Sequence, residues 1–227
     1  QDTVKLLDIG FGLGYNAFAA LKRAREIKGK IKITSVERDP TTVVNAAMLF
    51  PESSLELNML KKLASDGKWQ EANGSIELQY GDARQLAVNL NDRFDVIFLD
   101  GFSPDKNPEL WTYDFILQLK RLLAPSGVLA TYSAAYPVRG AMLRAGLVIG
   151  ESTPFGRRRG GTIAGLKPEM IDQSLSKKEM NIIRKSTAGT PYRDIGLNST
   201  RKQIIQKHSA LVARLRRHGV PRWYKEK

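Results

Sequence analysis

Short apolar segments alternate with amphipathic ones along the first two thirds of the chain. The apolar segments predict strands at 4–9, 32–37, 75–80, 95–100, 128–133, 147–152 and 161–166. Helical spacing of apolar residues predicts helices at 16–26, 45–49, 55–64, 113–123 and 138–145. This alternation predicts a parallel sheet with helices on both faces. The last strand follows the sixth after a short turn, so it is expected to be antiparallel.

The pattern changes after residue 167. Residues 168–198 are interrupted by glycine and proline and are predicted to be irregular. Residues 200–217 return to helical spacing, with apolar side chains on one side and basic side chains on the other. We therefore expect a folded domain over residues 1–167 and a basic extension over 168–227 that carries one helix.

Basic residues are concentrated in the same part of the chain. The formal net charge is +13, yet residues 1–155 contain 18 Lys and Arg against 18 Asp and Glu. Residues 156–227 contain 18 Lys and Arg against 5 Asp and Glu, and so carry the whole excess. Such asymmetry indicates an end that binds a polyanion, although basic tails are also often merely solvated. We favour nucleic acid as the partner.

Scarce residue types narrow the possible functions. The chain has no cysteine, which excludes disulfides and zinc–thiolate sites. Its two histidines, His208 and His218, argue against a histidine-rich metal site and against a Ser–His–Asp hydrolase. No apolar run approaches the roughly 18 residues that cross a membrane, and no signal peptide is visible. We expect a cytoplasmic enzyme.

A glycine cluster joins the first predicted strand to the first predicted helix in the sequence L-D-I-G-F-G-L-G-Y-N. Glycine lets the backbone approach a ligand closely and adopt turns that a Cβ blocks. A dinucleotide-binding turn has the spacing G-x-G-x-x-G. Here the glycines are Gly10, Gly12 and Gly14, and Tyr15 occupies the third dinucleotide position. The spacing favours S-adenosylmethionine, which has no pyrophosphate; a purely structural turn is the alternative.

Acidic residues follow the next two predicted strands. Glu37 ends the second strand in S-V-E-R-D-P, where a carboxylate accepts hydrogen bonds from both hydroxyls of a ribose. Asp82 follows the third strand in Y-G-D-A-R, where methyltransferases commonly bind the adenine amino group. Taken singly, Glu37 is a surface acid and Asp82 caps a turn. Ligands bind at the carboxyl ends of strands in such sheets, so the features together predict a nucleoside cofactor.

The most specific sequence is F-L-D-G-F-S-P-D-K-N-P-E-L-W-T at 98–112. With the glycine turn and the ribose segment, it resembles the methyltransferase domain of bacterial MnmC-type enzymes, which finishes the methylaminomethyl group on the wobble uridine of certain tRNAs. The resemblance covers residues 4–166, and 189–194 look like the tail of members without the fused oxidase domain. It implies a class I S-adenosylmethionine-dependent methyltransferase: an α/β, Rossmann-like fold with a seven-stranded, mostly parallel sheet and an antiparallel last strand.

The family's chemistry gives these acids roles. The implied acceptor is a primary alkyl amine, which must lose a proton before it attacks the sulfonium methyl group in line. Asp100 is implied to orient the amine or to take its proton. Neither a metal nor a flavin is expected. The residues implied to bind the cofactor are Asp8, Gly10, Phe11, Gly12, Gly14, Asn16, Glu37, Asp82, Ala83 and Asp100.

Aromatic residues and arginines are assigned to the tRNA, and to its anticodon stem-loop in particular. The residues are Phe102, Pro104, Trp111, Arg139, Arg157, Arg158 and Arg159. Phe102, Pro104 and Trp111 are expected to wall the pocket or to stack on a splayed-out base. The three successive arginines are expected to bind phosphates, and Arg139 to reach the substrate. The alternatives are structural: Trp111 is a packing anchor, Arg139 lies on the surface at a helix start, and the three successive arginines form a solubilising loop.

Two other functions fit parts of the pattern. A methyl- or aminopropyltransferase acting on a small amine, as in spermidine synthases, shares the fold and an acid after the fourth strand, but does not need the basic extension. A non-catalytic RNA-binding module does not need the intact set of glycines and acids. Family members also carry a segment ahead of the first strand. The printed sequence is therefore expected to begin late, and to bind the cofactor weakly if that segment helps to close the pocket.

Overall fold

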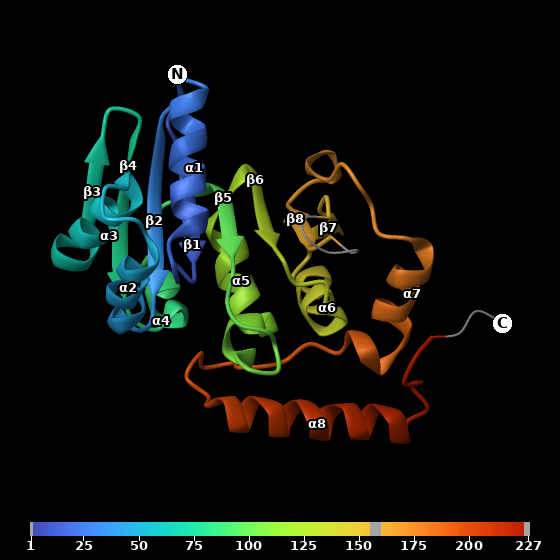
Figure 1. The fold of residues 1–227 in the computed structure, drawn as a ribbon. Coiled ribbons are helices and arrows are strands. Elements are labelled where there is room, and N and C mark those ends of the chain that lie inside the picture. Colours follow the sequence, from blue (N-terminus) through green and yellow to red (C-terminus); the bar gives the residue numbers. More distant parts are fainter. Residues whose placement is uncertain (1, 155–159, 225–227) are drawn as a thin grey trace. The chain divides into compact units, whose positions relative to one another are not determined.

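A computed structural model describes residues 2–154 and 160–224 of the chain (Figure 1). The chain divides into two compact units, Gln1–Asp100 (unit 1) and Gly101–Lys227 (unit 2). Each unit has its own strands, helices and buried apolar residues. None of the described helices is both long enough and apolar enough to span a membrane.

Unit 1 contains five strands in the order β3-β4-β2-β1-β5. They are β1 (Val4–Ile9), β2 (Ile31–Glu37), β3 (Lys68–Glu71), β4 (Gly74–Tyr80) and β5 (Phe94–Leu99). β1 pairs in parallel with β2 and β5, and β2 pairs in parallel with β4. The carboxyl ends of these four strands therefore lie at one edge, where the glycine turn and the predicted acids follow them.

Side chains cap the starts of three helices in unit 1. The helices of this unit are α1 (Tyr15–Glu26), α2 (Pro40–Ala46), the 3₁₀ turn η1 (Ala47–Leu49), α3 (Leu55–Asp66) and α4 (Ala83–Asn89). Asp39, Ser54 and Asp82 each accept a hydrogen bond from a backbone N–H of the first turn. The apolar faces of α1 and α3 pack on the sheet, in a core that includes Leu21, Ile33, Leu60, Leu63 and Ile76. This packing fixes the strand ends that carry the site.

Unit 2 contains three strands in the order β6-β8-β7. They are β6 (Leu123–Thr131), β7 (Val148–Glu151) and β8 (Thr162–Gly165). β8 runs antiparallel to both neighbours, so the predicted antiparallel last strand is confirmed. The helices are η2 (Pro108–Trp111), α5 (Tyr113–Leu122), α6 (Tyr136–Arg144), η3 (Pro168–Met170), α7 (Lys177–Lys185), η4 (Thr187–Gly189) and α8 (Arg201–Arg217).

The described residues contain eight strands, and the prediction of seven is wrong. The additional strand is β3, whose sequence K-W-Q-E is not an apolar run. β3 forms because a two-residue turn folds it back onto β4, with Glu71 opposite Gly74. Its stability thus comes from its partner strand rather than from its own pattern.

A second correction concerns the segment 168–198, which was predicted to be irregular but contains α7. The hydroxyl of Ser176 accepts the N–H of Glu179 and donates to the carboxylate of Glu179. This S-x-x-E pairing is a start signal for a helix. Ile182 and Ile183 are buried and attach the helix to unit 2. α7 is only nine residues long, so its apolar period is too brief to stand out.

The helix predicted at 200–217 is present as α8, which Thr200 begins through a capping box with Gln203. Its inner side carries the fully buried Ile204. His208 Nε2 lies 2.9 Å from the carbonyl oxygen of Thr190, and its ring packs on Tyr192. Burial lowers the pKa of His208, against the opposing effect of that backbone contact. The basic helix is thus docked on unit 2.

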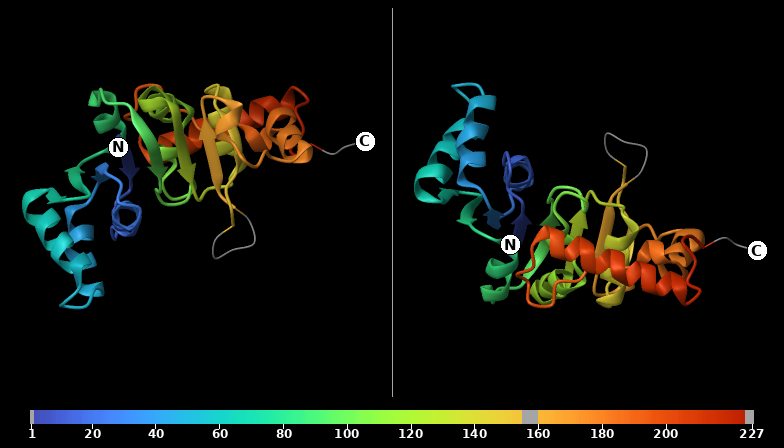
Figure 2. Two further views of the ribbon diagram at one scale, coloured as in Figure 1. Left: turned by 90° about the horizontal axis from the view of Figure 1, so that it is seen from above. Right: turned by 90° about the horizontal axis from the view of Figure 1, so that it is seen from below.

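Within unit 2, α8 lies on the side where β6 ends (Figure 1). Tyr132, which follows β6, packs edge-to-face on Trp111 of η2, and η2 contacts α8. Seen from below, α8 crosses in front of the other elements of unit 2 (Figure 2). The basic extension therefore covers the edge of unit 2 at which α/β proteins bind their ligands.

Candidate functional site

The glycine turn has a backbone that requires glycine. Gly10, Gly12 and Gly14 have φ angles of 95°, 55° and 84°, in the left-handed region. At Gly14, a Cβ would lie 2.7 Å from the ring of Phe18. The N–H of Gly14 donates to the carbonyl oxygen of Phe11, and α1 begins at the next residue. The turn thus has a conformation that side chains at these three positions would strain.

Phe11, assigned to the cofactor from the sequence, points its side chain into the core. Its ring is 3% exposed and packs edge-to-face on Phe18 at a centroid distance of 5.9 Å. Its N–H donates to the carbonyl oxygen of Val36. The structure therefore gives Phe11 a packing role, and its contact with a cofactor stays a prediction.

Glu37 ties the end of β2 to the glycine turn. Its Oε2 accepts the N–H of Gly12 at 2.9 Å. Its Oε1 accepts the N–H groups of Arg38 at 2.8 Å and Asp39 at 3.1 Å. A carboxylate has about four acceptor positions, so these bonds leave one on Oε2. Accepting two ribose hydroxyls, as predicted, requires one of the backbone N–H groups to be released.

Asp100 ends unit 1 directly after β5, and Asn16 holds its side chain. The Nδ2 of Asn16, in the first turn of α1, donates to Asp100 Oδ2 at 2.7 Å. The Asp100 N–H donates to the carbonyl oxygen of Ile9 at 2.9 Å. Asp100 is exposed, and its Oδ1 has no hydrogen-bond partner among the described residues. Asn16 and Asp100, both predicted site residues, are thus brought together.

Asp8 is the most unusual group beside the turn. It is fully buried at the end of β1, and its Oδ2 accepts the hydroxyl of Ser35 at 3.0 Å. Its Oδ1 has no hydrogen-bond partner. Burial raises the pKa of Asp8 to about 7, against the bond from Ser35 and with the negative charges of Asp100 and Glu37. Ser35 was not predicted; the register that pairs it with Asp8 is its only signal.

The carboxyl groups of Asp8, Glu37 and Asp100 therefore lie close enough in unit 1 to interact electrostatically. The charges of Asp100 and Glu37 reach Asp8 strongly enough to oppose its ionisation. A cationic ligand relieves such repulsion, and S-adenosylmethionine carries a sulfonium and an ammonium group. The described residues contain no group of His, Cys, Asp and Glu side chains that suits a metal ion. The glycine-rich turn, the unsatisfied Asp8 oxygen and the negative charge fit this cofactor.

Asp82 is engaged by its own helix. Its Oδ1 accepts the N–H of Arg84 at 2.9 Å, and its Oδ2 accepts Arg84 Nη2 at 2.6 Å. Burial opposes ionisation of Asp82, but Arg84 outweighs it and lowers the pKa of the carboxyl. The capping role that the sequence left open is present, with Ala83 buried behind it. Binding of adenine by Asp82 stays a prediction.

The aromatic residues predicted to contact tRNA differ in exposure. Phe102 is 77% exposed, and Pro104 is half-buried. Trp111 is fully buried, and its Nε1 donates to the carbonyl oxygen of Phe102 at 2.7 Å. Of the two roles left open for Trp111, the structure provides the packing anchor. Phe102 has the accessible ring.

Arg139 lies inside unit 2, at 1% exposure, rather than on its surface. Its Nε donates to Thr162 Oγ1, its Nη1 to Glu179 Oε1 and its Nη2 to the carbonyl oxygen of Gly161, at 2.9–3.0 Å. These bonds join α6 to β8 and α7. The surface position considered for Arg139 is therefore wrong, and its contact with tRNA stays a prediction. Arg157, Arg158 and Arg159 lie outside the described residues.

The raised pKa of Asp8 predicts a pH-dependent stability. A carboxyl that titrates near 7 when folded, against 3.8 when unfolded, stabilises the fold at low pH. That contribution is lost as the pH rises from about 4 through 7. Asparagine does not ionise, so we expect Asp8→Asn to keep its stability over this pH range. Its free energy of unfolding should exceed that of wild type by an amount that grows with pH and reaches a few kcal/mol at pH 8. Urea unfolding at pH 5, 7 and 8 measures it.

Asp2→Asn is the matched control for this effect, because Asp2 is an exposed carboxylate of the same unit. Its difference from wild type is expected to stay constant over the same pH range. An Asp8→Asn variant whose difference from wild type also stayed constant with pH would show that Asp8 is ionised in the folded protein.

Comparison with known proteins identifies the class. Residues 53–167 match a family described as S-adenosyl-L-methionine-dependent methyltransferases. This range is about half of the chain, and the chain belongs to this family. It is therefore an S-adenosylmethionine-dependent methyltransferase.

Individual similar proteins make the comparison more specific. The crystal structure of MNMC2 from Aquifex aeolicus is similar over 94% of this chain and 69% of that one, with 31% identity and a TM-score of 0.79. The tRNA 5-methylaminomethyl-2-thiouridine biosynthesis bifunctional protein MnmC of Azoarcus sp. is 33% identical over 171 residues, or 68% of this chain. An uncharacterized protein of Methanocaldococcus jannaschii is 32% identical over 210 residues, or 89% of this chain.

This chain spans 57% of the length of the Methanocaldococcus protein and 26% of the Azoarcus protein. The predicted resemblance to the methyltransferase domain of MnmC-type enzymes is confirmed. The predicted class I methyltransferase fold, with a mostly parallel sheet, is confirmed as well.

Proposed function

We propose that this chain transfers the methyl group of S-adenosylmethionine to the aminomethyl group on the wobble uridine of tRNA, giving 5-methylaminomethyl-(2-thio)uridine. The observation that carries the proposal is the set of three carboxylates, Asp8, Glu37 and Asp100, beside a glycine turn in a chain similar to MnmC proteins. Both reactants are cations at neutral pH, and this negative region suits both.

The cofactor is proposed to lie on the glycine turn. Glu37 would hold the ribose through its free acceptor position, and Asp82 the adenine amino group. Asp8 would face the positive end of the molecule, where a cation favours the ionised carboxylate over the protonated one. The bound cofactor supplies a methyl group on a positively charged sulfur. What the protein adds is position and charge.

Asp100 is proposed to orient the acceptor amine. Asn16 holds Oδ2 of this carboxylate, which leaves Oδ1 for the amine. In the transfer, the new N–C bond would replace the C–S bond of the donor, whose electron pair would stay on sulfur. The amine must first give up a proton, which Asp100 accepts directly or passes to water. A carboxylate here thus serves both binding of the ammonium form and its deprotonation.

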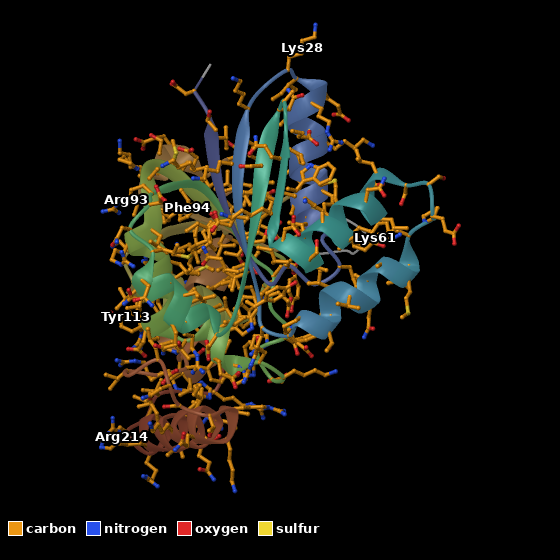
Figure 3. All side chains as sticks on the ribbon, turned by 90° about the vertical axis from the view of Figure 1, so that its left-hand side faces the viewer. Lys28, Lys61, Arg93, Phe94, Tyr113 and Arg214 are labelled. Carbon is orange, nitrogen blue, oxygen red and sulfur yellow. The ribbon has the colours of Figure 1, made fainter. Side chains whose placement is uncertain are left out.

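The basic helix α8 supports tRNA as the acceptor. α8 contains six Lys and Arg and no acidic residue, and no carboxylate of the described residues pairs with any of them. Nitrogen-tipped side chains, Arg214 among them, project from the helix (Figure 3). A small amine does not need such a surface. The intact acids equally disfavour a non-catalytic RNA-binding module.

Neutralising three exposed cations of α8 tests this acceptor. Lys202, Arg214 and Arg217 are exposed, and glutamine preserves helix propensity. The triple glutamine variant is expected to weaken tRNA binding and to lower the slope of log affinity against log salt by about 2. Cofactor affinity is expected to be unchanged. Filter binding at several salt concentrations gives the slope.

The matched control replaces Lys22, Lys30 and Lys61 of unit 1 by glutamine, which removes the same charge from another surface. Its slope is expected to stay closer to that of wild type. Equal slopes for the α8 variant and wild type would leave α8 as solvated charge and favour a small amine as acceptor.

A further inference from the structure

Trp223, near the C-terminal end of the described chain, forms an aromatic pair with Tyr136 of α6. The ring of Trp223 packs edge-to-face on Tyr136, with centroids 5.5 Å apart and an interplanar angle of 77°. Trp223 nevertheless remains 46% exposed, and Tyr136 is half-buried. An edge-to-face contact uses the edge of one ring and the face of the other, so the pair keeps ring surface open to solvent.

The segment that carries Trp223 is held in place by the fold. After α8, the N–H of Val220 donates to the carbonyl oxygen of Leu215, and the N–H of Thr187 donates to that of Pro221. The chain therefore folds back from α8 onto η4. The ammonium group of Lys185, at the end of α7, lies 4.9 Å from the centre of the Tyr224 ring. An exposed tryptophan fixed in this way is prepared for contact rather than left loose.

The surroundings of this pair are cationic. Tyr136 begins α6, and Trp223 follows the last residue of α8 by six positions. The exposed cations at the ends of α7 and α8 and in the segment after α8 are Arg184, Lys185, Arg216, Arg217 and Arg222. No carboxylate of the described residues pairs with any of them. Open ring faces beside unneutralised cations are the combination by which proteins bind unpaired nucleotides.

We propose that Trp223 and Tyr136 form a stacking site for an unpaired base of the RNA substrate, with the cations of α8 and its neighbours on the flanking phosphates. The inference rests on the proposed function, which makes a tRNA the acceptor. It adds a second contact with the RNA, remote in sequence from Asp100, that distinguishes unpaired from paired nucleotides. An RNA loop, with bases free to splay out, offers such a base, whereas a duplex does not.

The chemistry of α8 argues against a membrane as the alternative partner. A helix that lies on a lipid surface turns its apolar face outward. In α8, Ile204 is buried against unit 2, while Lys202, Gln206 and Arg217 are exposed. The outer surface is therefore polar and cationic, as RNA requires.

The test uses the full chain and three probes: an RNA hairpin with a seven-nucleotide unpaired loop, a blunt RNA duplex of equal length, and heparin. We expect Trp223→Ala to weaken binding of the hairpin about tenfold, and to leave duplex and heparin binding unchanged. Trp223→Phe, which keeps a stacking ring, is expected to restore most of the affinity. Ile195→Ala is the matched control, because Ile195 is 83% exposed in the same unit but has no ring.

Unchanged hairpin binding by Trp223→Ala would overturn the stacking site. An equal loss for all three probes, or no rescue by phenylalanine, would also overturn it, because the effect would then concern charge or folding. Failure of the wild-type chain to bind any RNA would instead contradict tRNA as the acceptor. If the wild-type chain methylated tRNA while Trp223→Ala bound the hairpin as well as wild type, only the stacking site would be contradicted.

Discussion

Asp100→Asn is expected to lower the rate of methyl transfer by about 10²- to 10⁴-fold and to leave the affinity for S-adenosylmethionine largely intact. Asparagine has nearly the shape of aspartate, so the contact with Asn16 Nδ2 can be kept through its amide oxygen. It has no negative charge to hold an ammonium group and cannot accept its proton. Initial rates with labelled donor measure the loss, and calorimetry measures cofactor binding.

Asp95→Asn is the matched control, because Asp95 is an exposed carboxylate of β5, the strand that Asp100 follows. Its rate is expected to equal that of wild type. Raising the pH supplies more neutral amine, so it is expected to restore part of the rate of Asp100→Asn. A variant that methylates at the wild-type rate would remove Asp100 from the reaction.

Glu37→Ala is expected to weaken binding of S-adenosylmethionine by about a hundredfold or more. A hydrogen bond to a charged acceptor contributes about 1.5–3 kcal/mol, and the ribose is proposed to make one with the free acceptor position of Glu37. The substitution also releases the N–H groups of Gly12, Arg38 and Asp39, which the carboxylate now holds. The glycine turn thereby loses its tie to β2. Titration calorimetry gives the Kd directly.

Glu37→Gln separates the two effects, because the amide oxygen can still accept a backbone N–H while the charge is gone. We expect its Kd to lie between those of wild type and Glu37→Ala. Glu52→Ala, at an exposed position of the same unit, is the control for a general loss of charge. Wild-type affinity in Glu37→Ala would place the cofactor elsewhere.

Local sequence patterns predicted most of the fold. The glycine turn, the parallel strands beside it and the helix at 200–217 all follow from apolar spacing and from residues that act on their immediate neighbours. β3 and α7 do not, because each is short and depends on a partner: β3 on β4, and α7 on its buried isoleucines. Elements of this kind are stabilised by tertiary contact, which sequence periodicity does not record.

The sequence predicted which residues lie at the site, but not their burial or their hydrogen-bond partners. Spacing brought Asp8, Glu37 and Asp100 to the ends of neighbouring strands. The burial of Asp8 and its single partner Ser35 depend on the register between β1 and β2, which no local pattern fixes. Arg139 is a stronger example, since its partners Thr162 and Glu179 lie far along the chain. A buried arginine and an exposed one look alike in a sequence.

The proposed reaction is tested most directly by the position of the transferred methyl group. The chain is incubated with labelled S-adenosylmethionine and tRNA that carries the aminomethyl uridine, and the tRNA is then digested to nucleosides. We predict label in 5-methylaminomethyl-(2-thio)uridine, and none when the tRNA lacks the aminomethyl group. Label in another nucleoside, or in an added small diamine while the tRNA stays unlabelled, would contradict the account.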